Sequence, residues 1–243
     1  MTKLFSATGL SYRTSGWAAI ASGTIGILAF SSLIIAVLTR TTFELTRQIL
    51  LLFNVFHVAV ILQFLLMIPM VFSLQKLSRN RARVMSRVTL VTGVITLSCT
   101  ALFLFLIFPK VMMDEYYMIP QAAFGVWLVV VNWQLVGVLS RGIRWFGMVV
   151  GVGLLLVGIY ELGFSIFVDP VGLKIPATDL NDIKDPGATP ANIIVHYILD
   201  VGTFMGVLTL PFWAIILGRK LVRERIEQPL TKVSYVPLSS REN

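Results

Sequence analysis

Residues 193–216 read IIVHYILDVGTFMGVLTLPFWAII, an almost continuous apolar stretch that is long enough to cross a lipid bilayer. Similar runs recur along the chain, separated by short polar segments. Backbone N–H and C=O groups in hydrocarbon must be paired within their own segment, so we expect each run to be an α-helix. The pattern predicts an all-α, polytopic membrane protein built as a bundle of six transmembrane helices.

The composition agrees with a membrane protein. The 243 residues are 56% hydrophobic and 13% charged, whereas soluble domains contain about 25% charged residues. The formal net charge is +8, but the basic residues are scattered over short loops and the C-terminal tail. We therefore expect the lipid bilayer, and no nucleic acid, as the partner of this chain. Cys99 is the only cysteine, which excludes an intrachain disulfide.

Six apolar runs have roughly the 17–25 residues that a membrane-spanning helix needs. The predicted spans are residues 17–38, 50–74, 88–108, 118–139, 145–168 and 193–217. Residues 169–192 form the longest loop, which is rich in Pro, Gly and Asp, and residues 218–243 form a basic tail. The fourth and fifth runs are separated only by SRGIR (140–144), which we predict to be a tight turn.

The distribution of Lys and Arg predicts the orientation. Most of them lie in the N-terminal segment, in the connections after the second and fourth spans, and in the tail. Positive charge marks the cytoplasmic side of a membrane protein. We therefore expect both termini to be cytoplasmic, in a multi-pass protein of the inner (plasma) membrane.

Small residues at four-residue spacing are expected to let helix backbones approach closely within one subunit. The pairs are Ser22 and Gly26, Gly147 and Gly151, and Gly202 and Gly206. Two prolines, Pro69 and Pro211, are expected to kink their spans.

Four ionisable side chains lie inside the predicted spans: His57, Glu161, His196 and Asp200. At a rise of about 1.5 Å per residue, all four fall about 5–10 Å below the outer membrane boundary. Ionisable groups at such a depth must pair with one another, lose their charge or line water. The sequence thus places a layer of costly polar groups in the outer half of the membrane.

We interpret this layer as an outward-facing polar pocket that binds or conducts a small solute, an ion or a proton. Its predicted lining is His57, Glu161, His196 and Asp200, with Asn54 and Gln121 as hydrogen-bonding partners. In the last span, Asn192, His196, Asp200 and Thr203 recur at helical spacing, so this stripe is expected to face the bundle. The alternative is a non-catalytic accessory or scaffold subunit, in which polar residues only join helices.

Two further alternatives use the same residues. His57 and His196 suit a b-type haem, although their depths differ by about 5 Å. The four ionisable residues together would suit zinc in an intramembrane hydrolase. The sequence contains no HExxH or GxSxG motif, so no catalytic residue is assigned and an enzyme is not favoured. The identity of any cofactor, and the formation of a homo-oligomer, are left open.

Residues 126–161, VWLVVVNWQLVGVLSRGIRWFGMVVGVGLLLVGIYE, combine Trp and small residues in one span, a short basic turn and a Gly-rich span. This pattern resembles bacterial six-span membrane proteins that are known only as domains of unknown function. The resemblance implies a bacterial inner-membrane protein, and it assigns a role to no residue.

Overall fold

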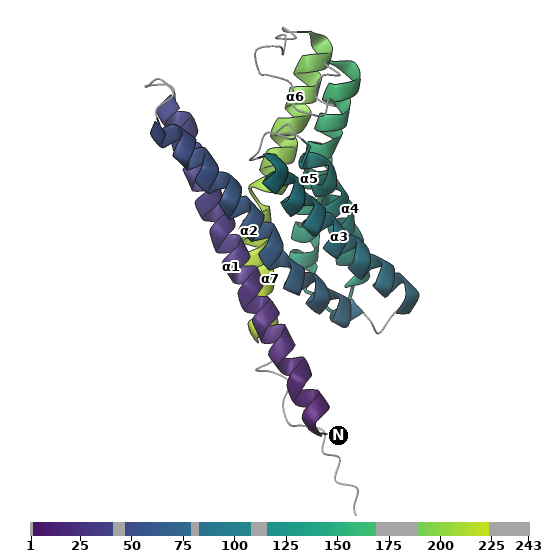
Figure 1. The fold of residues 1–243 in the computed structure, drawn as a ribbon. Helices are drawn as coiled ribbons and strands as arrows, with labels where there is room; N and C mark the ends of the chain where they lie inside the picture. Colours follow the sequence, from purple (N-terminus) through teal and green to yellow (C-terminus); the bar gives the residue numbers. More distant parts are fainter. Residues whose placement is uncertain (1, 41–46, 79–82, 108–115, 169–188, 224–243) are drawn as a thin grey trace, which may run out of the picture.

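The computed structural model describes residues 2–40, 47–78, 83–107, 116–168 and 189–223, and within these ranges the chain is almost entirely helical, with no β-strand (Figure 1). The helices are α1 (Thr2–Arg40), α2 (Arg47–Ser78), α3 (Arg83–Ile107), α4 (Met118–Gln134), α5 (Arg141–Phe167), α6 (Pro190–Gly202) and α7 (Leu210–Arg223). One π-helical turn, η3 (Thr203–Val207), joins α6 to α7. The all-α fold is thereby confirmed.

Among the described residues, five helical segments are long and apolar enough to cross a membrane: Tyr12–Ile35, Leu51–Leu77, Arg87–Leu106, Arg141–Phe167 and Pro190–Arg223. The last of them runs through α6, η3 and α7. Many of the large apolar side chains on these helices are exposed, for example Leu28, Leu102 and Ile166. A surface of this kind is expected where hydrocarbon, and not water, surrounds the helices. The chain is therefore a multi-pass membrane protein.

The fourth predicted span is shorter than expected. We predicted residues 118–139, but α4 is a 17-residue helix that ends at Gln134. Gly137 adopts a positive φ of 82° and belongs to the turn that follows α4, a conformation that glycine reaches without steric strain. The predicted turn SRGIR lies too far along the chain, because α5 already begins at Arg141.

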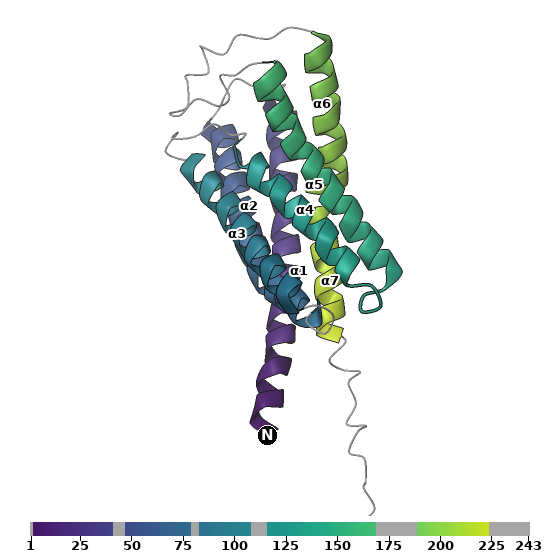
Figure 2. The same cartoon turned by 90° about the vertical axis from the view of Figure 1, so that its right-hand side faces the viewer.

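Helices that are neighbours in sequence pack side by side, and the chain closes on itself because α7 packs along α1 (Figures 1 and 2). The last span crosses the bundle: α6 lies against α5, whereas α7 lies mainly against α1. We call the end at which α2 ends, α5 begins and α7 ends the basic end, since it carries Lys76, Arg141, Arg144, Lys220 and Arg223. The opposite end, where α5 ends and α6 begins, is the far end.

The apolar core joins α1, α2, α3, α4, α5 and α7. Phe64 and Met70 of α2, Leu104 of α3, Leu154 of α5 and Trp213 of α7 belong to this core. Towards the far end the helices diverge into one arm made of α1 and α2 and a second arm made of α4, α5 and α6 (Figure 1). In agreement, residues 51–59 of α2 contain no buried side chain, and Val195 and Gly202 are the buried residues of α6.

The small residues do pack helices within one subunit, as predicted. A Cβ on Gly151 would meet the backbone of Gly125 in α4, and one on Gly206 would meet the backbone around Gly153 in α5. Ser22 donates a hydrogen bond to the carbonyl oxygen of Gln63 in α2, at 2.9 Å. Close backbone approach and interhelical hydrogen bonds are the two means by which membrane helices associate.

A π-helical turn lies just before Pro211, where we predicted a kink. The amide of Leu208 donates to the carbonyl of Thr203 at 3.0 Å, a five-residue spacing, and Pro211 itself has no N–H to donate. This turn redirects the chain between α6 on the second arm and α7 on α1. At Pro69, by contrast, α2 continues as one helix.

Candidate functional site

Glu161 is the central residue of the candidate site. It lies on α5 two turns before the helix ends, at about 9 Å from that end along the helix axis. Its side chain is fully buried, with 0% of its surface exposed. The hydroxyl of Ser165, one turn further along α5, donates a hydrogen bond to Glu161 Oε1 at 3.2 Å. A carboxyl group is therefore held inside the second arm of a membrane protein.

Tyr116 approaches Glu161 from the start of α4. It lies in the turn before the helix and is buried. Burial raises the pKa of the Tyr116 phenol, and the negative charge of Glu161 raises it further. When ionised, the carboxyl group of Glu161 thus acts on a buried phenol that lies 45 residues earlier in the chain, just before α4.

His196 lies at the surface of the second arm, against α5. Its ring lies edge-on to Tyr160, with 5.8 Å between the ring centroids, and edge-on to Phe164 at 6.3 Å. Tyr160 is buried and precedes Glu161 in the sequence, whereas His196 is exposed. The Nδ1 atom of His196 lies 2.9 Å from the carbonyl oxygen of Asn192, one turn earlier. An exposed imidazole therefore packs on the aromatic neighbour of the buried acid.

Gln121 lies on the α4 side of the second arm. It is 2% exposed, and its Oε1 has no hydrogen-bond partner among the described residues. The adjacent Ala122 packs on Gly158, which lies one turn before Glu161 on α5. The structure thus brings Gln121 and Glu161 into neighbouring turns of two packed helices.

The predicted stripe on the last span is only partly enclosed by other helices. His196 and Asp200 are exposed, and Asn192 and Thr203 are partly buried. The glycines on the other side of this segment explain the orientation, because Gly202 and Gly206 must face α5 for the two backbones to come so close. His196 and Asp200 are therefore not enclosed by neighbouring helices, although the ring of His196 packs on Tyr160 and Phe164 of α5.

Asn54 and His57 lie on the other arm. Asn54 is exposed, and His57 is partly buried, with Nδ1 at 2.8 Å from the carbonyl oxygen of Phe53 and its ring beside Phe56. In the described part of the chain α2 packs on α1, on α3 and slightly on α4, and substantial contacts with α5 or α6 are absent. The six predicted residues share a predicted depth in the membrane, but the structure divides them between the two arms.

This division weakens both cofactor alternatives. No group of three or more His, Cys, Asp or Glu side chains among the described residues is placed to hold a metal ion, although all four proposed zinc ligands are described. The two histidines of the haem alternative lie on separate arms (Figure 1). The described residues do not assemble either ligand set.

Two neighbours of Glu161 were missed as site residues in the sequence. Ser165 carries a recognisable signal, since a hydroxyl four residues after an acid in a helix is within hydrogen-bonding reach. Tyr116 carries no such signal, because its link to Glu161 depends on how α4 packs against α5.

Comparison with protein-family models, with curated proteins and with solved structures finds no match to this chain. The resemblance of residues 126–161 to bacterial six-span proteins therefore gains no support, and the functional argument rests on the residues themselves.

Proposed function

We propose that this protein is a six-span membrane protein that binds a proton or a small cation at Glu161. The complete burial of this carboxyl group in a membrane-spanning helix is the observation that supports the proposal most strongly. A carboxylate in such surroundings is costly unless it is neutralised by a proton or a cation. Binding of one or the other would meet that requirement.

The surroundings of Glu161 suit proton exchange. Tyr116 approaches from the turn before α4, Tyr160 precedes Glu161 on α5, and His196 of α6 packs on Tyr160. Phenol and imidazole groups take up and release protons, and imidazole does so near neutral pH. Exchange with the surroundings would begin at His196, because it is the exposed member of this group.

In this proposal the basic end faces the cytoplasm and the far end faces outward. The excess of Lys and Arg at the basic end supports that orientation. α4 is the sixth crossing, since it packs along α5 and its 17 residues rise about 25 Å, close to the thickness of a hydrocarbon core. The Glu161 site would then exchange with the outer side of a plasma membrane.

Infrared spectroscopy of the full-length protein in lipid nanodiscs tests the site directly. A protonated carboxylic acid has a C=O stretching band that disappears when the acid ionises. We expect one such band to titrate with pH in the wild type and to be absent in Glu161→Gln, which keeps the shape of the side chain and an acceptor for Ser165. If a small cation competes with the proton, replacing choline by Na⁺ or K⁺ will shift the midpoint of this titration.

The matched control is Asp200→Asn, because Asp200 is also a carboxylate in a membrane span but is exposed. The band should persist in this variant. A band that survives in Glu161→Gln, or that no folded sample shows at any pH, would refute the proposal. Far-ultraviolet circular dichroism must show unchanged helicity in both variants for the comparison to count.

The exposed polar residues of α6 favour a second candidate, a non-catalytic accessory subunit. His196 and Asp200 lie on the surface of a membrane-spanning segment, where lipid offers them no hydrogen bond. A partner subunit seated on this face would supply polar contacts. The infrared comparison separates the two candidates, because an accessory subunit requires no titrating acid at Glu161.

A further inference from the structure

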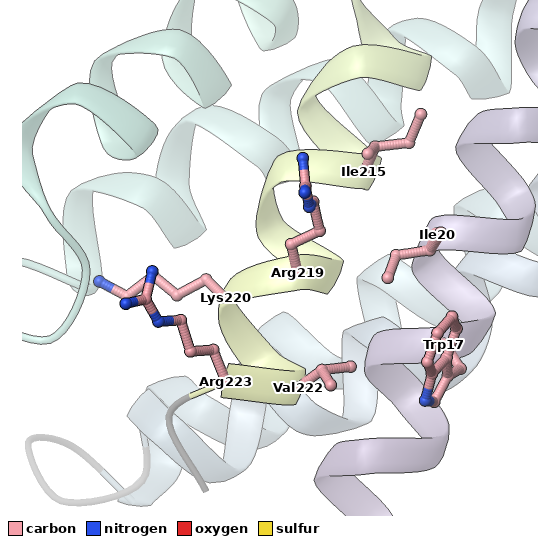
Figure 3. A pocket seen from close by; sticks show the side chains of 7 residues that line it. All are labelled: Trp17, Ile20, Ile215, Arg219, Lys220, Val222 and Arg223. Carbon is pink, nitrogen blue, oxygen red and sulfur yellow. The ribbon is translucent and has the colours of Figure 1, made fainter. Parts of the chain in front are cut away.

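A groove runs along the seam between α1 and α7 near the basic end. Its volume is about 910 Å³, and it is open to the surroundings. The lining residues are Trp17, Ile20, Ile215, Arg219, Lys220, Val222 and Arg223 (Figure 3). None of the candidate residues around Glu161 belongs to it, so it is a separate feature of the molecule.

Glycines bring α1 and α7 into contact beside this groove. A Cβ on Gly16 of α1 would lie 2.9 Å from the carbonyl oxygen of Gly218 in α7, and a Cβ on Gly218 would lie 2.6 Å from that of Gly16. The two backbones are therefore in direct contact, and the larger side chains stand on either side of the seam. Figure 3 shows Trp17 and Ile20 projecting from α1 towards α7, and Val222 projecting from α7 towards α1.

The lining changes from apolar to cationic along the groove. Ile20 and Ile215 lie on the side towards the centre of the bundle. Arg219 follows Ile215 by about 6 Å along the axis of α7, and Arg223 follows by about 6 Å more. Trp17 is more than half exposed, at 55%, and lies at the level of the cations, since the adjacent Gly16 touches Gly218 and Val222. Indole rings favour this boundary between hydrocarbon and headgroups.

We propose that this groove binds one anionic phospholipid from the leaflet next to the basic end. Both walls belong to segments able to span a membrane, Tyr12–Ile35 and Pro190–Arg223, so the groove opens sideways to lipid. An acyl chain fits along Ile20 and Ile215, and the phosphate fits beside Arg219, whose planar guanidinium can donate two parallel hydrogen bonds to it. Basic pockets between transmembrane helices are known to hold anionic headgroups.

The charges make a zwitterionic lipid or an apolar protein segment a poorer occupant. Three cationic side chains, Arg219, Lys220 and Arg223, line the groove from α7 (Figure 3). A phosphodiester headgroup with net negative charge neutralises part of this charge, whereas a choline headgroup adds a further cation. The apolar half of the groove in turn distinguishes a lipid from a soluble phosphate, which would leave Ile20 and Ile215 uncovered.

Native mass spectrometry of the full-length protein in a mild detergent measures this binding. The probes are phosphatidylglycerol and phosphatidylcholine with the same acyl chains, titrated one at a time. We expect one phosphatidylglycerol to bind more tightly than phosphatidylcholine, and Arg219→Gln to weaken phosphatidylglycerol about fivefold, the effect of one cation near a membrane surface. Inorganic phosphate at the same concentration should not displace the lipid.

Arg141→Gln is the matched control, because Arg141 is exposed at the same end of the molecule but lies outside the groove. It should leave the affinity unchanged. The proposal is overturned if the two lipids bind equally, if Arg141→Gln weakens binding as much as Arg219→Gln does, or if inorganic phosphate displaces the lipid.

A second readout locates the lipid without altering any cation. Phosphatidylglycerol with brominated acyl chains quenches tryptophans that it touches, and Trp17 is the tryptophan in the groove. We expect saturable quenching in the wild type that Trp17→Phe removes, while the helicity of the variant stays unchanged because Trp17 is largely exposed. Saturable quenching of equal size in Trp17→Phe would place the lipid elsewhere and reject the groove as its site.

Discussion

Glu161 and Asp200 are both carboxylic acids in membrane-spanning segments, but their surroundings are opposite. Glu161 is fully buried and accepts a hydrogen bond from Ser165, whereas Asp200 is exposed on α6. Because Glu161 is enclosed by protein, whatever neutralises it must be held inside the bundle, whereas a partner of Asp200 can approach from outside. The distinction makes Glu161, among the predicted residues, the best candidate for binding a proton or cation.

The raised pKa of Tyr116 gives a test of the proximity between this phenol and Glu161. Removing the charge with Glu161→Gln should lower the pKa of Tyr116 towards the ordinary tyrosine value, without reaching it, because burial still raises it. The measurement is an alkaline titration of tyrosinate absorbance, in which Tyr116→Phe identifies the late-ionising group. An unchanged titration in Glu161→Gln would show that the two groups do not interact.

The sign of the stability effect follows from the same shift. Because folding raises the pKa of Tyr116, its contribution to stability is present in full below the ordinary tyrosine pKa, near 10, and is lost as the pH rises through the folded value. Wild-type protein should therefore lose more stability at alkaline pH than Tyr116→Phe does. Thermal unfolding at neutral and at alkaline pH provides the comparison.

At the scale of helices, glycines determine which elements can touch. Gly125 meets Gly151 between α4 and α5, Gly153 meets Gly206 between α5 and η3, and Gly16 meets Gly218 between α1 and α7. In hydrocarbon the hydrophobic effect does not drive helices together, so such close contacts carry a large share of the association energy. They also fix the rotation of each helix about its axis, including the outward rotation of His196 and Asp200.

Two glycines of α5 offer a matched pair of substitutions. A Cβ on Gly153 would collide with the backbone of Met205 and Gly206, whereas a Cβ on Gly142 has no atom within 4 Å. We expect Gly153→Ala to destabilise the protein by about 1–3 kcal/mol, and Gly142→Ala to be neutral or stabilising by up to about 1 kcal/mol. Thermal unfolding followed by circular dichroism measures both, and equal effects would contradict the packing of α5 against η3.

At the scale of the whole molecule, the last span couples the two arms. Its α6 part lies on α5 and its α7 part lies on α1, with the π-helical turn η3 between them. The same polypeptide segment therefore contacts the Glu161 region at one end and lines the groove at the other. Isolated π-helical turns occur frequently at functional sites, which agrees with the position of η3 at this junction.

The orientation and the number of crossings can be tested with single cysteines in a Cys99→Ala background. Lys76→Cys and Arg141→Cys probe the basic end, and Thr189→Cys probes the far end; all three positions are exposed. In intact cells we expect a membrane-impermeant maleimide to label position 189, and positions 76 and 141 to react only after permeabilisation. Labelling of positions 76 and 141 from opposite sides would show that α4 does not cross the membrane.

The sequence by itself determined the helices, and it predicts an approximate depth for each polar residue. Long apolar runs must be helical in hydrocarbon, and a constant rise per residue converts position along a run into depth. The sequence also identified the pairs of small residues, because small side chains at that spacing let membrane helices approach closely. It missed the early end of α4, which is followed by a turn that contains the left-handed Gly137 and precedes the basic residues.

Only the tertiary structure decided which residues of one layer lie together. His57 and Glu161 have similar predicted depths in the membrane, yet they lie on different arms of the bundle. A helix surrounded by lipid is apolar on nearly every face, so its sequence contains little information about which face turns inward. That rotation is set by contacts such as Gly202 against Gly153, which join residues far apart in the chain and form only when the helices pack.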